Sequence, residues 1–278
     1  MTLERLQAYV RAGRERGVER LAVTEHLFRF REAYRALEGW WEADAAHPAL
    51  AAAAAQYWRD HVSASVADYV RLVEQAKAAG LPVLLGIELD WIPGREEDLR
   101  RFLAPYDWDV VLGSVHWIGA WGFDILGHPV HDAEWERRDV DAVFRDYAAL
   151  LLDLAASGLC DVLAHPDLPK LTGRRPASLE PFHRAILEAA RRGGCALEVN
   201  GNGYHKPVGE PYPAPELLAA ARAADIPITL ASDAHEPERV GERFDELAAY
   251  AAAAGYGACV TFQARRPVVQ ALPAGRAG

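Results

Sequence analysis

Six apolar segments of this sequence each lead into side chains that bind metal ions well. Imidazole and carboxylate groups suit zinc, manganese or iron, and a carboxylate can bridge two ions so that a shared water becomes hydroxide near neutral pH. The pattern therefore predicts a polynuclear metal centre. The residues are His26 after LAVTE, Glu88 in VLLGIE, His116 after VVLGSV, His165 after DVLA, Glu198 in ALEVN, and Asp233 and His235 in ITLASDAH.

These segments need a scaffold on which strand ends meet. Continuous Val, Ile and Leu runs are typical of strands buried on both faces of a parallel sheet, and the carboxyl ends of such strands carry the reactive groups of α/β barrels. Helix-like segments separate the runs, so we expect one parallel α/β barrel. Its strands are expected at 20–24, 82–89, 109–115, 160–164, 195–200, 226–232 and 256–262, and its helices at 3–17, 63–79, 95–104, 139–157, 178–192, 214–224 and 239–254.

Two segments interrupt this alternation. Residues 27–62 carry three tryptophans and an alanine run, which predicts helices with aromatic contacts, whereas residues 117–138 are loop-like. Both follow a strand end with a predicted ligand, where a lid or pocket wall belongs on a barrel. The last residues, 271–278, are small and polar and are expected to be frayed.

Composition narrows the function. The 278 residues, 51% of them hydrophobic, suffice for a single domain spanning 1–278, and the formal net charge is −10. Such a surface disfavours nucleic acids and membrane surfaces, whereas a cluster of divalent metals would reverse the charge locally for a small phosphorylated substrate. The oligomeric state is left open.

The cysteines point to a reducing compartment. Cys160, Cys195 and Cys259 are odd in number, widely spaced and close to apolar runs, so they predict buried free thiols rather than disulfides or a zinc finger. Neither end shows a signal peptide, and no apolar run reaches membrane length. We expect a cytoplasmic protein.

Several predicted ligands also have plainer roles open to them. Glu88 alone could cap a loop, and Asp233 could hydrogen-bond its own backbone in a turn. If the strand stays extended through SDAH, Asp233 and His235 instead project from the same face as a ligand pair. Glu198, with Asn200, either lies in the pocket floor or orients a neighbouring ligand.

Five further histidines fall in helix-like or loop-like segments. We expect them on the surface and exclude them from the metal site. They are His47, His61, His128, His131 and His183.

Ordered matches along nearly the whole chain resemble histidinol-phosphate phosphatases of the polymerase-and-histidinol-phosphatase (PHP) superfamily. The six strand-end matches are specific for the superfamily, and WGFD and KPVGEPYP resemble its histidinol-phosphatase branch. The matching segments are TEH at 24–26, GIELDWIPG at 86–94, GSVHWIGAWGFD at 113–124, AHPDLPK at 164–170, EVNGNGYHKPVGEPYPAPELL at 198–218 and SDAH at 232–235.

The resemblance implies a distorted, TIM-like (β/α)7 barrel in which up to three zinc, manganese or iron ions hydrolyse a phosphomonoester. It implies that Glu88 bridges two ions and that Asp233 completes the first of these sites. His116 and His165 would bind the second ion, and His26 and His235 the third. Glu88, Asp233 and His235 are accordingly the implied catalytic residues.

Substrate contacts follow from the same resemblance. Arg175, in LTGRRP, resembles a family arginine that holds the phosphate, although a solvated loop charge is the plainer alternative. His205 and Lys206 fall where the family usually shows a basic pair after leucine. The segment here reads NGNGYHKP instead, a departure that bears on the identity of the substrate.

The largest departure is at the N-terminus. Family members open with a strand that bears an H-x-H pair and a further histidine soon after, whereas the first histidine here is His26. We expect that the start codon has been placed downstream of this strand. The alternative is an enzyme that has lost part of its centre.

Three functions remain open from the sequence. The first is hydrolysis of L-histidinol phosphate in histidine biosynthesis. The second is a PHP phosphoesterase that acts on another small phosphate or nucleotide, and the third is an inactive, truncated relic.

Overall fold

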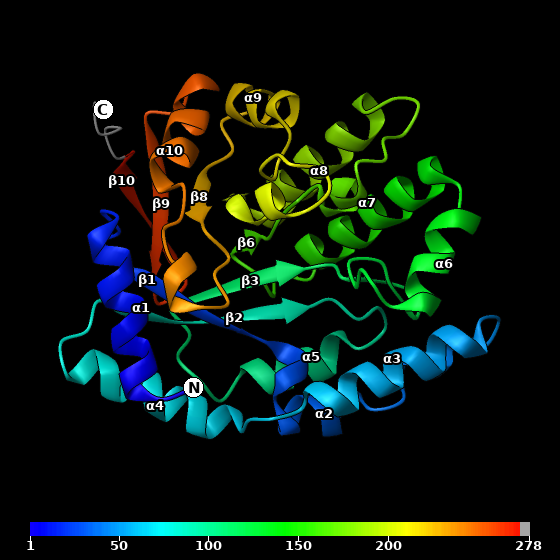
Figure 1. Ribbon diagram of the computed structural model, residues 1–278, viewed down its shortest axis with the longest axis horizontal. Helices are drawn as coiled ribbons and strands as arrows, with labels where there is room; N and C mark the ends of the chain where they lie inside the picture. Colours follow the sequence, from blue (N-terminus) through cyan, green and yellow to red (C-terminus); the bar gives the residue numbers. More distant parts are fainter. Residues whose placement is uncertain (273–278) are drawn as a thin grey trace.

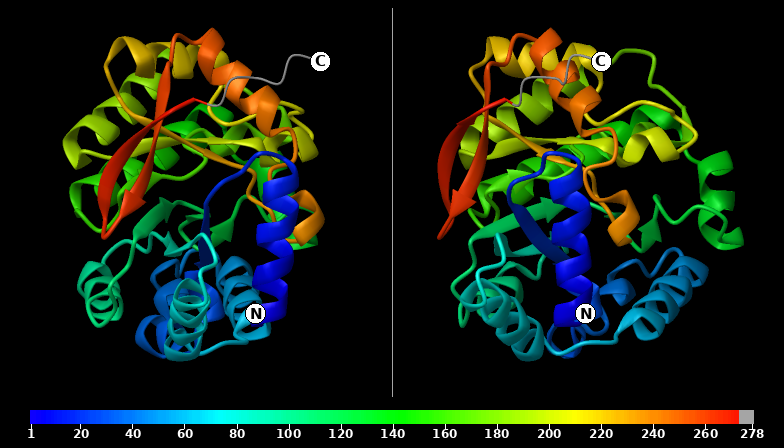
Figure 2. Two further views of the ribbon diagram at one scale, coloured as in Figure 1. Left: turned by 90° about the vertical axis from the view of Figure 1, so that its left-hand side faces the viewer. Right: turned by 60° about the vertical axis from the view of Figure 1, so that its left-hand side comes forward.

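The computed structural model describes residues 1–272 and contains a curled, six-stranded parallel sheet (Figures 1 and 2). The strands follow the order β1-β2-β3-β6-β7-β8, and every neighbouring pair is parallel. The predicted α/β class with a parallel sheet is therefore confirmed. The strands are β1 (Leu21–His26), β2 (Val83–Asp90), β3 (Val110–Ser114), β6 (Val162–Leu163), β7 (Ala196–Asn200) and β8 (Ile228–Ala231).

Helices follow these strands along the chain and cover the outer face of the sheet. In α8, Phe182, Ile186, Ala189 and Ala190 form one buried stripe at helical spacing. All seven predicted helices are present, with ends shifted by a few residues. They are α1 (Leu3–Glu15), α4 (Val66–Ala78), α5 (Glu96–Leu103), α7 (Val140–Ala156), α8 (Glu180–Gly193), α9 (Pro215–Ala223) and α10 (Phe244–Ala253). No described helix is long and apolar enough to span a membrane.

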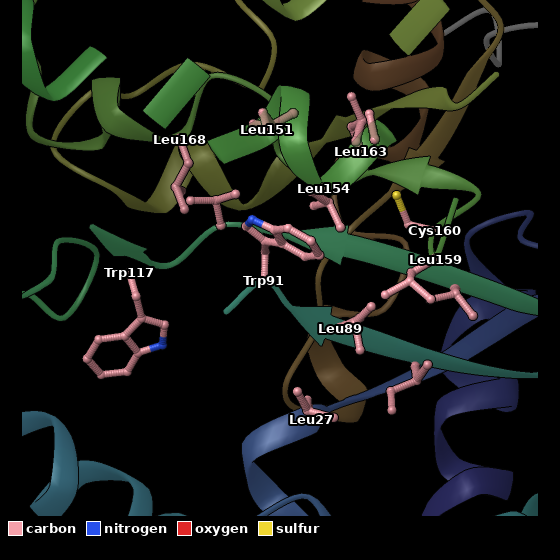
Figure 3. Close-up of a cluster of buried hydrophobic side chains, with 14 of the residues drawn as sticks. Leu27, Leu89, Trp91, Trp117, Leu151, Leu154, Leu159, Cys160, Leu163 and Leu168 are labelled. Atoms are coloured by element: carbon pink, nitrogen blue, oxygen red, sulfur yellow. The ribbon is translucent and has the colours of Figure 1, made fainter. Parts of the chain in front are cut away.

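A hydrophobic core fills the space between sheet and helices. Figure 3 shows part of it, including Trp91 after β2 and Leu154 of α7. Gly113 in β3 allows this close packing, because a Cβ atom there would lie 2.7 Å from the Cβ of Cys160 and 2.9 Å from Leu154. The cysteines are free, with Cys160 and Cys195 buried as expected and Cys259 half-buried.

The two insertions gather beyond the carboxyl ends of β2 and β3 (Figure 1). They contact each other, since the Trp40 and Trp117 rings lie 5.1 Å apart and the Ala120 amide donates to Asp44 at 3.0 Å. The loop-like prediction for 117–138 was partly wrong, because a short hairpin and a helix that begins at Pro129 form there. The elements are η1 (Leu27–Arg29), α2 (Arg31–Leu37), η2 (Trp40–Ala43), α3 (Pro48–His61), β4 (Trp117–Ile118), β5 (Trp121–Gly122) and α6 (Pro129–Arg137).

The last predicted strand does not join the parallel sheet. β9 (Ala258–Gln263) turns through Ala264 and Arg265, both with positive φ, and pairs antiparallel with β10 (Arg266–Ala271). Such a two-residue turn favours a hairpin over a crossover. The Arg265 guanidinium lies 3.1 Å from Asp161, which ties the hairpin to the beginning of β6. The expected frayed end thus includes Ala271 of β10, and 273–278 lie outside the described residues.

A cavity of about 930 Å³ occupies the concave side of the sheet. All six residues of β1 line it, and so do consecutive residues from Thr229 to Asp233 at the end of β8. A strand that faces a cavity with one face contributes alternate residues, so consecutive residues indicate that both strands present an edge. β1 and β8 are indeed the two outer strands of the sheet. We call this space the inner cavity.

Candidate metal centre

The strand register brings the first predicted ligands together. His26, the last residue of β1, is directly opposite Glu88 in the parallel β1–β2 ladder. His116 and His165 each follow a neighbouring strand, β3 and β6, by two residues. All four side chains line a second cavity of about 300 Å³, which we call the site cavity. It shares these residues, except His116, with the inner cavity.

Three ligand atoms form a nearly equilateral triangle. The Oε1 atom of Glu88 lies 3.3 Å from Nε2 of His116 and 3.1 Å from Nε2 of His165, and the two nitrogens are 3.3 Å apart. With zinc–nitrogen distances of 2.0–2.1 Å, ligand atoms around a tetrahedral ion are separated by about 3.3 Å. The triangle therefore fits one face of such a coordination shell, and these residues suit a divalent ion.

The second oxygen of Glu88 faces a different histidine. Its Oε2 atom lies 3.1 Å from Nδ1 of His26. Each carboxylate oxygen thus has its own imidazole neighbours. Burial would raise the pKa of Glu88, but His26, His116 and His165 together hold it well below its usual value, so the carboxylate is ionised.

Asp90 fixes the orientation of His116. Its Oδ1 atom lies 2.7 Å from Nδ1 of His116, and the residue is fully buried. This contact leaves Nε2 of His116 to point at Glu88. Burial would lower the pKa of His116, but Asp124, Asp90 and Glu88 raise it well above its usual value. Asp90 was not among the predicted site residues, although its position two residues after Glu88 places both on the same face of β2.

His165 is held through its backbone. Its amide donates to Oε2 of Glu198 at 2.9 Å, and its carbonyl accepts from the hydroxyl of Tyr147 at 3.2 Å. Its φ of +29° lies in a region that non-glycine residues seldom adopt, so these contacts hold a strained residue. Glu198 also accepts from Nδ2 of Asn200 at 2.9 Å.

Asp233 and His235 do not continue an extended strand, which corrects that expectation. β8 ends at Ala231, and Asp233 has a φ of +51°. Its Oδ2 atom accepts from the side-chain amides of Asn200 at 3.2 Å and Asn202 at 3.0 Å, which hold the carboxylate at the edge of the site cavity. The His235 ring is about half exposed and lies 5.7 Å from the ring of His26.

The three expected substrate-binding residues lie in different surroundings. Lys206 lines the site cavity, and within residues 1–272 no carboxylate forms an ion pair with it. Arg175 is outside that lining and lies 2.6 Å from Glu210. His205 is also outside it and lies 3.2 Å from Glu242.

One excluded histidine is not on the surface. His131 is only 1% exposed, because the insertion folds around it, and burial lowers its pKa to about 4. It lies outside both cavities. Of the other four, His47 is exposed and three are half-buried: His61, His128 and His183.

Replacing Glu88 by glutamine should weaken metal binding more than the loss of any single histidine, because both carboxylate oxygens face imidazoles. We expect zinc affinity to fall by more than roughly 100-fold, the upper range for a lost outer-shell partner. Competition with a chromophoric chelator measures this. Glu134→Gln, a buried carboxylate outside both cavities, is the matched control, and equal affinities in the two variants would refute the assignment.

A second prediction concerns pH. Burial is the main cause that raises the pKa of Glu198 to about 7 from an ordinary 4.5. Folding then disfavours its ionised form, so this carboxyl lowers stability as pH rises from about 4.5 to 7. In metal-free protein, Glu198→Gln should gain stability relative to the parent over that interval, by at most about 3 kcal/mol. Urea unfolding at both pH values measures it, and a pH-independent difference would contradict it.

Comparisons with known proteins agree with this geometry. The PHP domain model matches residues 2–202. A probable histidinol-phosphatase of Deinococcus radiodurans is 43% identical over 198 residues, which cover 71% of this chain and 74% of that protein. The resemblance inferred from the sequence is thereby confirmed.

Two solved structures share the fold. One is a histidinol phosphate phosphatase from Lactococcus lactis subsp. lactis, complexed with zinc, L-histidinol and phosphate, at a TM-score of 0.71 and 18% identity over 94% of this chain and 92% of that one. The other is a putative histidinol phosphatase from Listeria monocytogenes, at a TM-score of 0.53 and 19% identity over 67% of this chain and 78% of that one. From the family match and the Deinococcus relative, the chain belongs to the PHP domain family.

Proposed function

We propose that this protein hydrolyses L-histidinol phosphate to L-histidinol and phosphate with divalent metal ions. The observation that carries the proposal is the triangle of Glu88, His116 and His165, which fits an ion and lies in a cavity also lined by Lys206, a residue without an ion pair among residues 1–272. The histidinol-phosphatase relative supports the substrate.

Divalent ions would supply a water of lowered pKa and positive charge for the phosphoryl oxygens. The chain's own residues would hold these ions. We assign Oε1 of Glu88, His116 and His165 to one ion, and His26, with Oε2 of Glu88, to a neighbouring one. Asp233 and His235, at the edge of the same cavity, would complete the centre. Each residue binds or orients, and none is required to form a covalent bond with the substrate.

Lys206 is the phosphate contact that the geometry favours. Lys206 lines the site cavity, and no carboxylate among residues 1–272 forms an ion pair with it. Arg175 is instead engaged by Glu210. A lysine acts on phosphate as a point charge, which suits a substrate whose other oxygens are held by ions.

A phosphate-release assay with zinc, manganese or iron tests the function. Lys206→Met should raise the Michaelis constant for L-histidinol phosphate roughly 10- to 100-fold while metal content stays constant, since a charge-assisted contact is lost. Arg175→Met should change it much less. No release from L-histidinol phosphate, with release from a nucleotide, would favour the broader phosphoesterase alternative.

We also propose that one further strand closes the barrel between β1 and β8. The two open edges beside the inner cavity support this. So does α1, whose Arg5 guanidinium, in the first turn, donates to the carbonyl of His235 at 3.1 Å, because α1 therefore begins near the site. A strand parallel to β1 would end where α1 begins, and strand, α1 and β1 would form one βαβ unit, as in a (β/α)7 barrel.

Adding an N-terminal segment that supplies a strand between β1 and β8 should therefore raise both the melting temperature and the phosphatase activity. The first gain comes from burial of two strand edges, and the second from further metal ligands. The same extension with a proline at its centre is the control. If the extended protein has the same melting temperature as the 278-residue chain and stays inactive, the alternative of an inactive, truncated protein is favoured.

A further inference from the structure

Asp124 lies beside the metal centre but is not one of its proposed ligands. It follows the β4–β5 hairpin and lines the site cavity. Its Oδ1 atom is buried and has no hydrogen-bond partner, and within residues 1–272 no lysine or arginine forms an ion pair with it. A carboxylate that lines a cavity and has no cationic partner attracts a positively charged group that enters there, and a charge-assisted hydrogen bond to it would bind that group favourably.

The cavity beside Asp124 also has aromatic walls. Phe28, Tyr57 and Trp117 line it together with Asp124. Aromatic faces attract organic cations, and a carboxylate among them selects for positive charge. Burial is the main cause that raises the pKa of Tyr57, and the charge of Asp124 raises it further; the same charge raises the pKa of His116, against the effect of burial.

The chain holds Asp124 in a fixed position. The Phe123 amide donates to the carbonyl of His116 at 3.3 Å, and the Leu126 amide donates to the carbonyl of Asp124 at 3.0 Å. Phe123 and Trp121 are fully buried. The segment that presents the ligand His116 therefore also presents Asp124, and the distance between them is set by packing rather than by a free loop.

The cavity is thus bipolar, with the metal ligands and Lys206 for an anion and Asp124 for a cation. We infer that Asp124 is a specificity-determining residue that binds the protonated primary amine of the substrate while the metal centre and Lys206 hold its phosphate. This inference rests on the proposed function. The amine is favoured over the imidazole ring, because an imidazole with an ordinary pKa near 6.5 is mostly neutral above pH 7.

Separate binding titrations of L-histidinol and inorganic phosphate to the zinc-loaded protein test this. Asp124→Asn should weaken the binding of L-histidinol roughly 10- to 100-fold and the binding of phosphate less than about twofold, and the zinc content should stay unchanged. Asp132→Asn is the matched control, since Asp132 accepts from the Gly127 amide at 3.1 Å in the same segment but outside the cavity. The analogue 3-(imidazol-4-yl)propan-1-ol, which lacks the amine, should bind parent and Asp124→Asn equally.

Three outcomes would overturn the inference. Unchanged L-histidinol binding would remove Asp124 from recognition, and a loss of zinc would make it a metal ligand. An equal loss of affinity for the amine-free analogue would show that Asp124 contacts the imidazole ring instead of the amine. Turnover of L-histidinol phosphate by the parent protein is measured separately, so failure of the proposed function is distinguished from failure of this contact.

Discussion

The arrangement of this protein depends on one buried carboxylate. Glu88, on β2, is only 7% exposed, and an isolated charge there would cost several kcal/mol. Three imidazoles within 3.3 Å offset that cost, and an ion in the triangle would offset it further. Because the attraction falls off with distance, the neighbouring strands must hold each histidine close, and the parallel register does so.

Hydrogen bonds with residues behind the predicted ligands then determine how those ligands are oriented. Asp90 sets the direction of the His116 ring, and Glu198 holds the strained backbone of His165. These groups are buried and accept hydrogen bonds from the residues they hold, which explains why polar side chains occur on strands otherwise made of Val, Ile and Leu. The site cavity in front is lined by residues of both insertions, such as Tyr57 and Asp124, and by Lys206 and Tyr212 from the segment after β7.

Much of the centre could be predicted because parallel strands end at one edge of a sheet. That rule alone predicted that Glu88 and His116 lie close together. Other features depend on local backbone geometry that apolar patterns do not contain. The hairpin turn at 264–265 diverted the last strand, and the left-handed conformation of Asp233 ended β8 early. The WGFD segment indicated the family but not the position of Asp124 in the cavity lining, which follows from how the second insertion folds.

Anomalous diffraction at the zinc edge, from crystals soaked in zinc, tests the central claim most directly. The account predicts a peak bounded by Oε1 of Glu88 and the Nε2 atoms of His116 and His165, at about 2.0–2.1 Å from each nitrogen. No peak within that triangle, with the three side chains still at hydrogen-bonding distance, would contradict it. Glu88 would then be a structural carboxylate paired with protonated histidines.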